Sequence, residues 1–326
     1  MKRLLWALVV CGLLVLPLWA KGGKAPPPEA DDDLVLRVAA LNGPSAIPMA
    51  YLFEHPPVLD GMKTAFEVEA GPDILLPKML KGEIDVGVLP INLAAKTYGA
   101  SKGAVVLGAI MGNGMVSLVT KDRRVTSLGS LRGKRVHVAG QGATPDYVFR
   151  YLLKEAGLAE GEVTLDYSIP PAEIPQALLS GRIGYAVLPE PFSTAVISRD
   201  PAFCRAIDFQ KEFALAQGDP QAVYPMTALV VISRRVKKYP KTVRLFLDAL
   251  KDAIAWTNAH PEEAGELAEK HTPQGAAAAR AIPSSAFVYT GAVDAMPSVE
   301  ALLGIFLDSD VDSVGGALPD RGFYFE

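Results

Sequence analysis

The chain has 326 residues, of which 50% are apolar and 21% are charged, and its formal net charge is −4. This composition is typical of a globular protein rather than a disordered one, and the length is sufficient for two domains that each bury a core. The acidic balance, without a stripe of Lys and Arg, argues against binding to nucleic acid.

Residues 1–20 have the pattern of an export signal. Two cations form the start, an apolar run follows, and Ala20 offers a small residue for cleavage. We therefore predict a signal peptide and a periplasmic or other extracytoplasmic location. Two alternatives stay open: lipidation of Cys11, and retention of residues 4–20 as a membrane anchor, although that run is at the short limit for a span and contains a proline.

Residues 21–33, "KGGKAPPPEADDD", are rich in Gly, Pro and acidic residues without an apolar period, which predicts a flexible tether. Cys204 is the one cysteine after this segment, so no internal disulfide is expected. The four histidines are far apart and lack the spacing of metal ligands. We predict no metal site and no cofactor.

A first series of short apolar runs alternates with helical patterns from Leu34 onward. The predicted strands cover residues 34–41, 63–70, 84–90 and 104–110, and the predicted helices cover 45–54, 72–82 and 91–99. Strands that alternate with helices indicate largely parallel sheets with helices on both faces.

Residues 114–121 depart from this alternation, and a second series follows. Its predicted strands cover residues 134–140, 163–168, 183–189 and 204–209, and its predicted helices cover 144–158, 171–181 and 190–198. A strand over 224–233 comes next, then helical patterns over 239–271 and 298–308, and an aromatic-rich closing loop over 312–326.

Two turn segments of the first series recur in the second. "GEIDVGVLPINLAAK" (82–96) and "GRIGYAVLPEPFSTA" (181–195) share Gly, Ile, Val, Leu and Pro at a shift of 99, and "GPSAIP" (43–48) and "GQGATP" (140–145) share Gly, Ala and Pro at a shift of 97. Chance and shared secondary structure are one account of each match. The common order and nearly common offset favour two lobes of like construction.

The repeated turns are candidates for ligand binding, because ligands of open parallel sheets bind outside the carboxyl ends of the strands. Gly140 and Gly142 allow the main chain to approach a ligand. Thr144 suits an N-cap and Pro145 the first helical position, and free N–H groups at this helix start attract an anion. Ser45 is predicted to do the same in the other lobe.

Side chains around these turns extend the candidate site. Asn92 and Asn113 are candidates for hydrogen bonds to a ligand, and apolar walls are expected from Phe192, Met49 and Tyr147.

Two carboxylates in the turns leave alternatives open. Glu190 and Asp146 either cap their helices or receive an amine or ring N–H of the ligand. The chain has no dinucleotide fingerprint, phosphate loop, Ser elbow, Cys–His pair or carboxylate dyad at recognisable spacing. We therefore predict no catalytic residues and no enzymatic activity.

With these residues the chain resembles the periplasmic substrate-binding proteins of ABC importers, in the group of the nitrate, sulfonate and taurine binders and their thiamine-precursor relatives. The resemblance rests on the export signal, "GEIDVGVLP", "LRGKRVHVAGQGATPDYVFRYLLKEAGL", "ALLSGRIGYAVLPEPFSTAV" and "GGALPDRGFY", and it extends from about Leu34 to the C-terminus. It implies an α/β, two-lobed Venus-flytrap of the type II periplasmic binding protein fold, in which each lobe is a mixed, mostly parallel sheet flanked by helices.

The resemblance also implies a division of the chain and a set of contacts. Lobe I covers residues 34–120 with 225–326, lobe II covers 121–224, and the crossings lie near Thr120 and Tyr224. The implied ligand contacts are Ser45, Ala46, Asn92, Gln141, Gly142, Ala143, Thr144, Glu190 and Phe192, to which the residue chemistry adds Asn113.

The function implied is capture of a ligand by closure of the lobes and delivery to a membrane permease. No Arg or Lys occupies the candidate turns to grip nitrate or a sulfonate, which favours a small organic ligand that is partly anionic or heteroaromatic. A monomer is expected. The alternatives are an enzyme of the same fold that acts on a chorismate-derived compound, and an extracytoplasmic ligand sensor.

Overall fold

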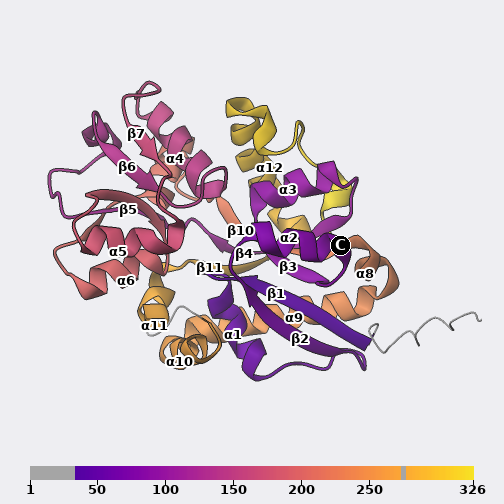
Figure 1. Ribbon diagram of the computed structural model, residues 1–326. Coiled ribbons are helices and arrows are strands. Elements are labelled where there is room, and N and C mark those ends of the chain that lie inside the picture. Colours follow the sequence, from indigo (N-terminus) through magenta and orange to yellow (C-terminus); the bar gives the residue numbers. More distant parts are fainter. Residues whose placement is uncertain (1–33, 273–276) are drawn as a thin grey trace, which may run out of the picture. The chain divides into compact units, whose positions relative to one another are not determined.

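The computed structural model describes residues 34–272 and 277–326 (Figure 1). The predicted signal peptide over 1–20, with Cys11, and the predicted tether over 21–33 lie outside the described residues. None of the described helices is long and apolar enough to cross a membrane.

The first sheet has six strands in the order β11-β4-β10-β3-β1-β2. Its strands are β1 (Val35–Leu41), β2 (Lys63–Glu69), β3 (Val86–Pro90), β4 (Val105–Asn113), β10 (Pro225–Ile232) and β11 (Phe287–Gly291). β1 pairs in parallel with β2 and β3, whereas β10 runs antiparallel between β3 and β4. All of β10 is buried, which explains why Thr227 is its one polar side chain. β11 was not predicted.

The second sheet has five strands in the order β7-β6-β8-β5-β9. Its strands are β5 (Val116–Thr120), β6 (Arg135–Val138), β7 (Thr164–Asp166), β8 (Tyr185–Pro189) and β9 (Cys204–Asp208). β6 pairs in parallel with β7 and β8, and β5 runs antiparallel to β8. The order β7-β6-β8-β5 thus repeats the order β2-β1-β3-β10 of the first sheet. The predicted mixed, two-lobed α/β fold is confirmed.

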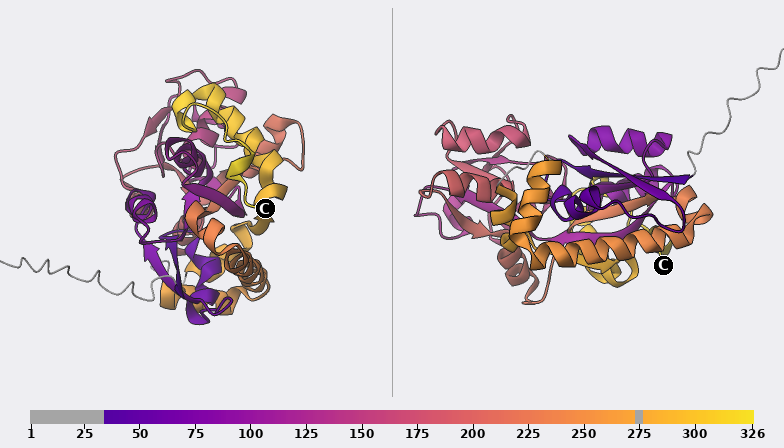
Figure 2. Two further views of the ribbon diagram at one scale, coloured as in Figure 1. Left: turned by 90° about the vertical axis from the view of Figure 1, so that its right-hand side faces the viewer. Right: turned by 90° about the horizontal axis from the view of Figure 1, so that it is seen from below.

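Helices cover both faces of the first sheet. α2, α3 and α12 lie above it in Figure 1, α1 and α9 lie below it, and Figure 2 shows α9 running along that lower face. Phe246, Leu250 and Ile254 are buried at four-residue spacing and form the inner side of α9. The helices that follow first-sheet strands or close the chain are α1 (Ala46–Glu54), α2 (Pro72–Lys81), α3 (Ile91–Ala100), α8 (Ser233–Lys238), α9 (Pro240–Ala259), α10 (Pro261–His271), α11 (Ala277–Ala281) and α12 (Ala292–Ser309).

The second sheet is covered in the same way. α4 and α7 pack on one face, and α5 and α6 pack on the other. These helices are α4 (Thr144–Glu155), α5 (Ile174–Leu179), α6 (Phe192–Arg199) and α7 (Phe209–Gln217). α7 was not predicted, although Asp208 caps it by accepting the N–H of Gln210 at 2.9 Å.

Short 3₁₀ turns complete the described chain. They cover Leu128–Leu131, Pro171–Glu173, Ile282–Ser284, Val311–Ser313 and Arg321–Phe323. The predicted closing loop at the C-terminus is ordered by its aromatic side chains, since Phe323 and Tyr324 are buried.

The chain passes from the first sheet to the second over Gly114 and Met115, six residues earlier than predicted. The strand over 116–120, which was assigned to lobe I, pairs with β8 and β9 and so belongs to the second sheet. A glycine between β4 and β5 ends the first strand, whereas the prediction placed the break at the first charged residue after β5.

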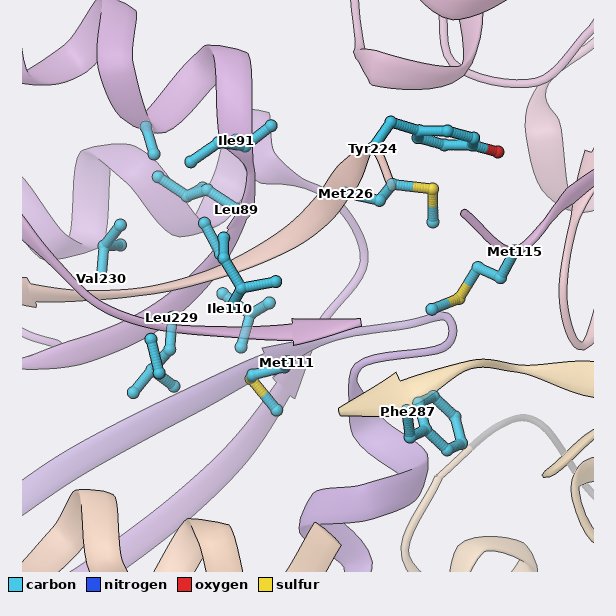
Figure 3. Close-up of a cluster of buried hydrophobic side chains, with 14 of the residues drawn as sticks. Leu89, Ile91, Ile110, Met111, Met115, Tyr224, Met226, Leu229, Val230 and Phe287 are labelled. Carbon is cyan, nitrogen blue, oxygen red and sulfur yellow. The ribbon is translucent and has the colours of Figure 1, made fainter. Parts of the chain in front are cut away.

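The two crossings pack against each other. A Cβ on Gly114 would approach the Cε1 atom of Tyr224 to 2.6 Å and Oε1 of Gln210 to 2.4 Å, so only glycine allows this approach. Figure 3 shows Tyr224 and Met226 at the start of β10, and Met115 just before β5, within one buried apolar cluster. The core therefore continues from one sheet into the other through the crossings.

Candidate functional site

A cavity of about 240 Å³ lies between the two sheets, at the carboxyl ends of their parallel strands. Its first wall consists of the turns after β1, β2 and β3, and its second wall consists of the turns after β6, β7 and β8. Met226 and Thr227 of β10 lie between the walls. Larger hollows of about 640 and 490 Å³ are lined mainly or wholly by residues of the second lobe, and those of about 310 and 290 Å³ by residues of the first lobe, all away from these turns.

The turn before α1 contributes Ser45 to the cavity wall but keeps its hydroxyl occupied. Ser45 Oγ accepts the N–H of Leu41 at 3.1 Å and lies 3.2 Å from the carbonyl oxygen of the same residue. Ala46, the next predicted contact, is fully buried inside α1 and does not line the cavity. The Ser45 hydroxyl therefore stabilises its own turn.

The turn before α4 reaches the cavity through Gly140 and Ala143. Gly140 has φ of 90°, a conformation that favours glycine. Gln141 is exposed and, like Gly142, does not line the cavity. Thr144 is the first residue of α4 rather than its N-cap, and Ala143 holds the N-cap position, so the predicted cap was wrong by one residue.

Asn92 of α3 joins the first lobe to this turn. Its side chain is fully buried, and Nδ2 donates to the carbonyl oxygens of Gly142 at 2.9 Å and Ser313 at 3.4 Å. Oδ1 accepts the hydroxyl of Thr144 at 3.3 Å. The predicted contacts Asn92 and Thr144 are thus brought together, but they bind each other across the lobes and neither lines the cavity.

Asp146 is committed to structural contacts. Its carboxylate accepts the N–H of Gly142 at 2.9 Å, Nε of Arg150 at 2.8 Å and the hydroxyl of Tyr167 at 2.6 Å. Burial, followed by the bond to this carboxylate, raises the pKa of Tyr167 well above its usual range. Of the two interpretations left open for Asp146, the structure supports a structural role: the carboxylate stands in the first turn of α4, holds the preceding turn through Gly142, and is not free to receive a ligand N–H.

Glu190 has a similar role in the second repeat. It is 2% exposed, and its carboxylate accepts the N–H of Thr194 at 3.1 Å and Nε of Arg205 at 2.9 Å. Glu190 therefore caps α6 and forms an ion pair instead of lining the cavity, whereas Phe192 does line it. The sequence prediction missed Arg205, because no local pattern in β9 indicates a partner in the turn after β8.

The other candidate side chains lie elsewhere. Asn113 ends β4, where its N–H donates to Ala286 at 3.3 Å, and Met49 is fully buried. The hydroxyl of Tyr147 donates to Oδ2 of Asp310 at 2.8 Å. None of the three lines the cavity. The β10 residues that do so were missed, because a crossing strand was not expected to reach the site.

The chemistry available at the site is that of backbone and apolar side chains. Among the described residues, no group of three or more His, Cys, Asp and Glu is placed to hold a metal ion. The polar side chains of the cavity wall are Asn42, Ser45 and Thr227. This arrangement suits the enclosure of a small molecule.

Comparisons with known proteins agree with this architecture. The model of the NMT1-like family matches residues 47–271. The crystal structure of an ABC transporter from Parabacteroides distasonis has a TM-score of 0.78 and 30% identity, over 90% of this chain and 99% of that chain. Comparison with curated proteins finds no match.

Two more distant structures share the fold. The periplasmic aliphatic sulphonate binding protein of Escherichia coli has a TM-score of 0.71 at 15% identity, covering 89% of this chain and 97% of that chain. The periplasmic nitrate-binding protein of Synechocystis has a TM-score of 0.62 at 13% identity, covering 86% of this chain and 84% of that chain.

Proposed function

The chain belongs to the NMT1-like family, and from this premise we propose that it is an extracytoplasmic solute-binding protein that captures a small organic ligand and delivers it to the permease of an ABC transporter. The 30% sequence identity to an ABC transporter structure, over 90% of this chain and 99% of that chain, supports this role. The resemblance to the binding proteins of ABC importers, inferred from the sequence, is confirmed.

The cavity between the sheets is the observation that carries the proposal. A ligand enclosed there touches turns of both lobes, because the walls come from the turns after β1, β2 and β3 on one side and from those after β6, β7 and β8 on the other. Such a ligand stabilises the closed arrangement of the lobes over an open one by its greater affinity for the closed one. The permease then has a closed, loaded form to recognise.

We propose capture without chemical conversion. The two carboxylates nearest the cavity turns, Asp146 and Glu190, are held by internal donors, so neither is positioned as an acid or base toward the cavity. The export route belongs to the same proposal: residues 1–20 direct export, residues 21–33 act as the tether, and the protein works as a monomer.

The first experiment measures binding, closure and turnover together. Small carboxylates, sulfonates and pyrimidines are screened by thermal shift, and each hit is followed by small-angle scattering and by chromatography of the recovered ligand. We expect a stoichiometric complex, a smaller radius of gyration and an unchanged ligand. Consumption of the ligand would show that the protein is an enzyme.

The second experiment separates delivery from sensing. The protein is added to proteoliposomes that contain the permease and ATPase of an ABC importer from the same organism. We expect ATP hydrolysis to rise when protein and ligand are both present. A ligand that closes the lobes without any rise in ATP hydrolysis would contradict delivery and favour a sensor.

A further inference from the structure

Among the described residues, none that lines the cavity between the lobes has an ionisable side chain. Twenty residues form it, and they comprise six prolines, three glycines, three alanines, five larger apolar residues, and Asn42, Ser45 and Thr227. Three of the prolines come from each side of the cavity, and they are Pro44, Pro72 and Pro90 opposite Pro145, Pro171 and Pro189. A ligand charge buried here meets no side chain of opposite charge, which is costly.

Three carboxylates behind the wall are already paired within the protein. Asp146 accepts three hydrogen bonds from protein donors, and Glu190 is bonded to Arg205. Glu69, which precedes the turn after β2, pairs with Lys78. Each charge is satisfied inside one lobe, so none of them is left to balance an ion in the cavity.

Helix N-termini offer another way to hold an anion, since their first four N–H groups are free and their dipoles are positive. Five helices begin at the cavity wall. In each of them a proline takes one of the positions from N-cap to N3 and removes one donor. These prolines are Pro48 of α1, Pro72 of α2, Pro90 before α3, Pro145 of α4 and Pro191 before α6.

Carboxylates of the protein also occupy three of these helix starts. Asp73 lies in the first turn of α2 and Asp146 in the first turn of α4. Glu190 accepts the N–H of Thr194 in the first turn of α6. The positive potential of these three helix ends is therefore compensated before any ligand arrives.

The volume of the cavity limits the size of the ligand. About 240 Å³ is below the roughly 300–1,000 Å³ of pockets for drug-sized molecules. Phe192, Met226 and the proline rings offer apolar contact surfaces, and Thr227 offers a hydroxyl. A single ring with one or two polar groups matches this combination.

We propose that the cavity selects an uncharged, mainly apolar ligand of about one ring, and that it discriminates against inorganic and organic anions. This inference rests on the proposed function, because it assumes that the cavity is the capture site.

Matched pairs of probes test the ligand class. Benzamide is compared with benzoate, and benzenesulfonamide with benzenesulfonate, by isothermal titration calorimetry on the mature chain, with nitrate as a further anion. We expect at least one uncharged member to bind at least about tenfold more tightly than its ion. Tighter binding of either ion or of nitrate, or no binding by any uncharged member, overturns the proposal.

A charge placed in the wall gives a second test. Phe192 is half-buried, so the stem of a lysine in Phe192→Lys can cover the wall while its ammonium reaches the cavity mouth. We expect this variant to prefer benzoate over benzamide. The control Leu215→Lys changes a side chain that is 75% exposed on α7, and it should keep the wild-type preference. An unchanged preference in folded Phe192→Lys contradicts the site, and the wild-type panel remains decisive if this variant does not fold.

The outcomes also separate this inference from the proposed function. Suppose that an anion binds tightly, closes the lobes and is recovered intact. This result contradicts the proposal of an uncharged ligand but agrees with the proposed function as a binding protein. Chemical conversion of an uncharged probe contradicts the proposed function as a binding protein but agrees with the proposed ligand class.

Discussion

Residues 82–96 and 181–195 form the same structural unit, a strand that ends in Leu-Pro and leads into a helix. β3 lies between a parallel neighbour, β1, and an antiparallel one, β10, and β8 lies in the same way between β6 and β5. The final prolines, Pro90 and Pro189, line the cavity from opposite sides. The shared part of the two segments therefore builds the cavity wall.

The two units differ in the position of their buried carboxylate relative to the strand. Asp85 stands just before β3, at the position of Gly184 in the second unit, and it accepts Nε of Arg235 at 2.7 Å. Glu190 stands just after β8, at the position of Ile91 in the first unit, and it pairs with Arg205. One ion pair thus lies at the strand end remote from the cavity, and the other lies behind the cavity wall. Neither presents a charge to a ligand.

The largest effect is expected at the remote pair. Asp85 is fully buried and the side chain of Arg235 is 8% exposed, so Asp85→Asn breaks a buried ion pair by removing its negative charge. We expect the free energy of unfolding to fall by about 3–5 kcal/mol, measured by urea denaturation. Ligand affinity should not change, because the site lies at the opposite end of β3.

The control for this variant is an exposed ion pair in the same lobe. Asp60 pairs with Lys241 at 2.7 Å, and both side chains are largely exposed. Asp60→Asn should lower the free energy of unfolding by no more than about 1 kcal/mol. Equal losses of unfolding free energy in the two variants would contradict the prediction that the buried Asp85 pair stabilises the fold more than an exposed pair does.

A smaller effect is expected at the pair behind the wall. The side chain of Arg205 is 33% exposed, so water can solvate it when Glu190→Gln removes the opposite charge. We expect a loss of about 1–3 kcal/mol in the free energy of unfolding. If Glu190→Gln lowers the free energy of unfolding as much as Asp85→Asn does, the two ion pairs contribute equally to stability. The predicted energetic difference between the two units would then be wrong.

The comparison also shows what the sequence could and could not predict. The repeated strands were predictable because their apolar runs and turn residues are local signals. The hydrogen-bond partner of a side chain is not determined by the residues next to it in sequence. The sequence around Asn92 is equally consistent with a ligand contact and with the interlobe bond that Asn92 makes to Gly142. Glu190 likewise needed Arg205, which only the pairing of β5 with both β8 and β9 brings near it.

The cavity wall shows the same limit. Phe192 and Ala143 were predicted because they stand in repeated turns, and both line the cavity. Met226 and Thr227 were missed because β10 is far along the chain from the other first-sheet strands. Its position between β3 and β4 is a property of the sheet order, for which the sequence carries no local pattern.

The interlobe contact of the first unit is expected to affect ligand binding. Asn92→Ala removes the bonds to Gly142 and Thr144 that join the lobes. We expect ligand affinity to fall about 5- to 30-fold, as for a loss of about 1–2 kcal/mol, measured by calorimetry with the tightest probe. The control Asn258→Ala removes a 2.9 Å bond to Phe287 inside the first lobe and should lower stability only. Equal affinity losses in both variants would deny Asn92 a role in closure.

The smallest effect sharpens the distinction between contacts across the lobes and contacts within one. Tyr147 of α4 donates to Asp310 beyond α12, and Tyr98 of α3 donates to Asp320 at 2.6 Å inside the first lobe. Burial, and then the bond to Asp310, raises the pKa of Tyr147 to about 12, and the bond to Asp320 raises the pKa of Tyr98 to about 12. Since the folded-state pKa exceeds the ordinary value of about 10, each buried, hydrogen-bonded hydroxyl contributes stability below pH 10, and this contribution is lost as the pH rises towards 12.

Each tyrosine-to-phenylalanine variant should therefore lack one tyrosine that ionises near pH 12 in an absorbance titration of tyrosinate. Its free energy of unfolding should also fall less steeply above pH 10 than that of the wild type. Only Tyr147→Phe should also weaken ligand binding, by no more than about fivefold, because its bond forms across the lobes. A matching loss of affinity in Tyr98→Phe would mean that closure depends on the stability of the first lobe as a whole rather than on the contacts between the lobes.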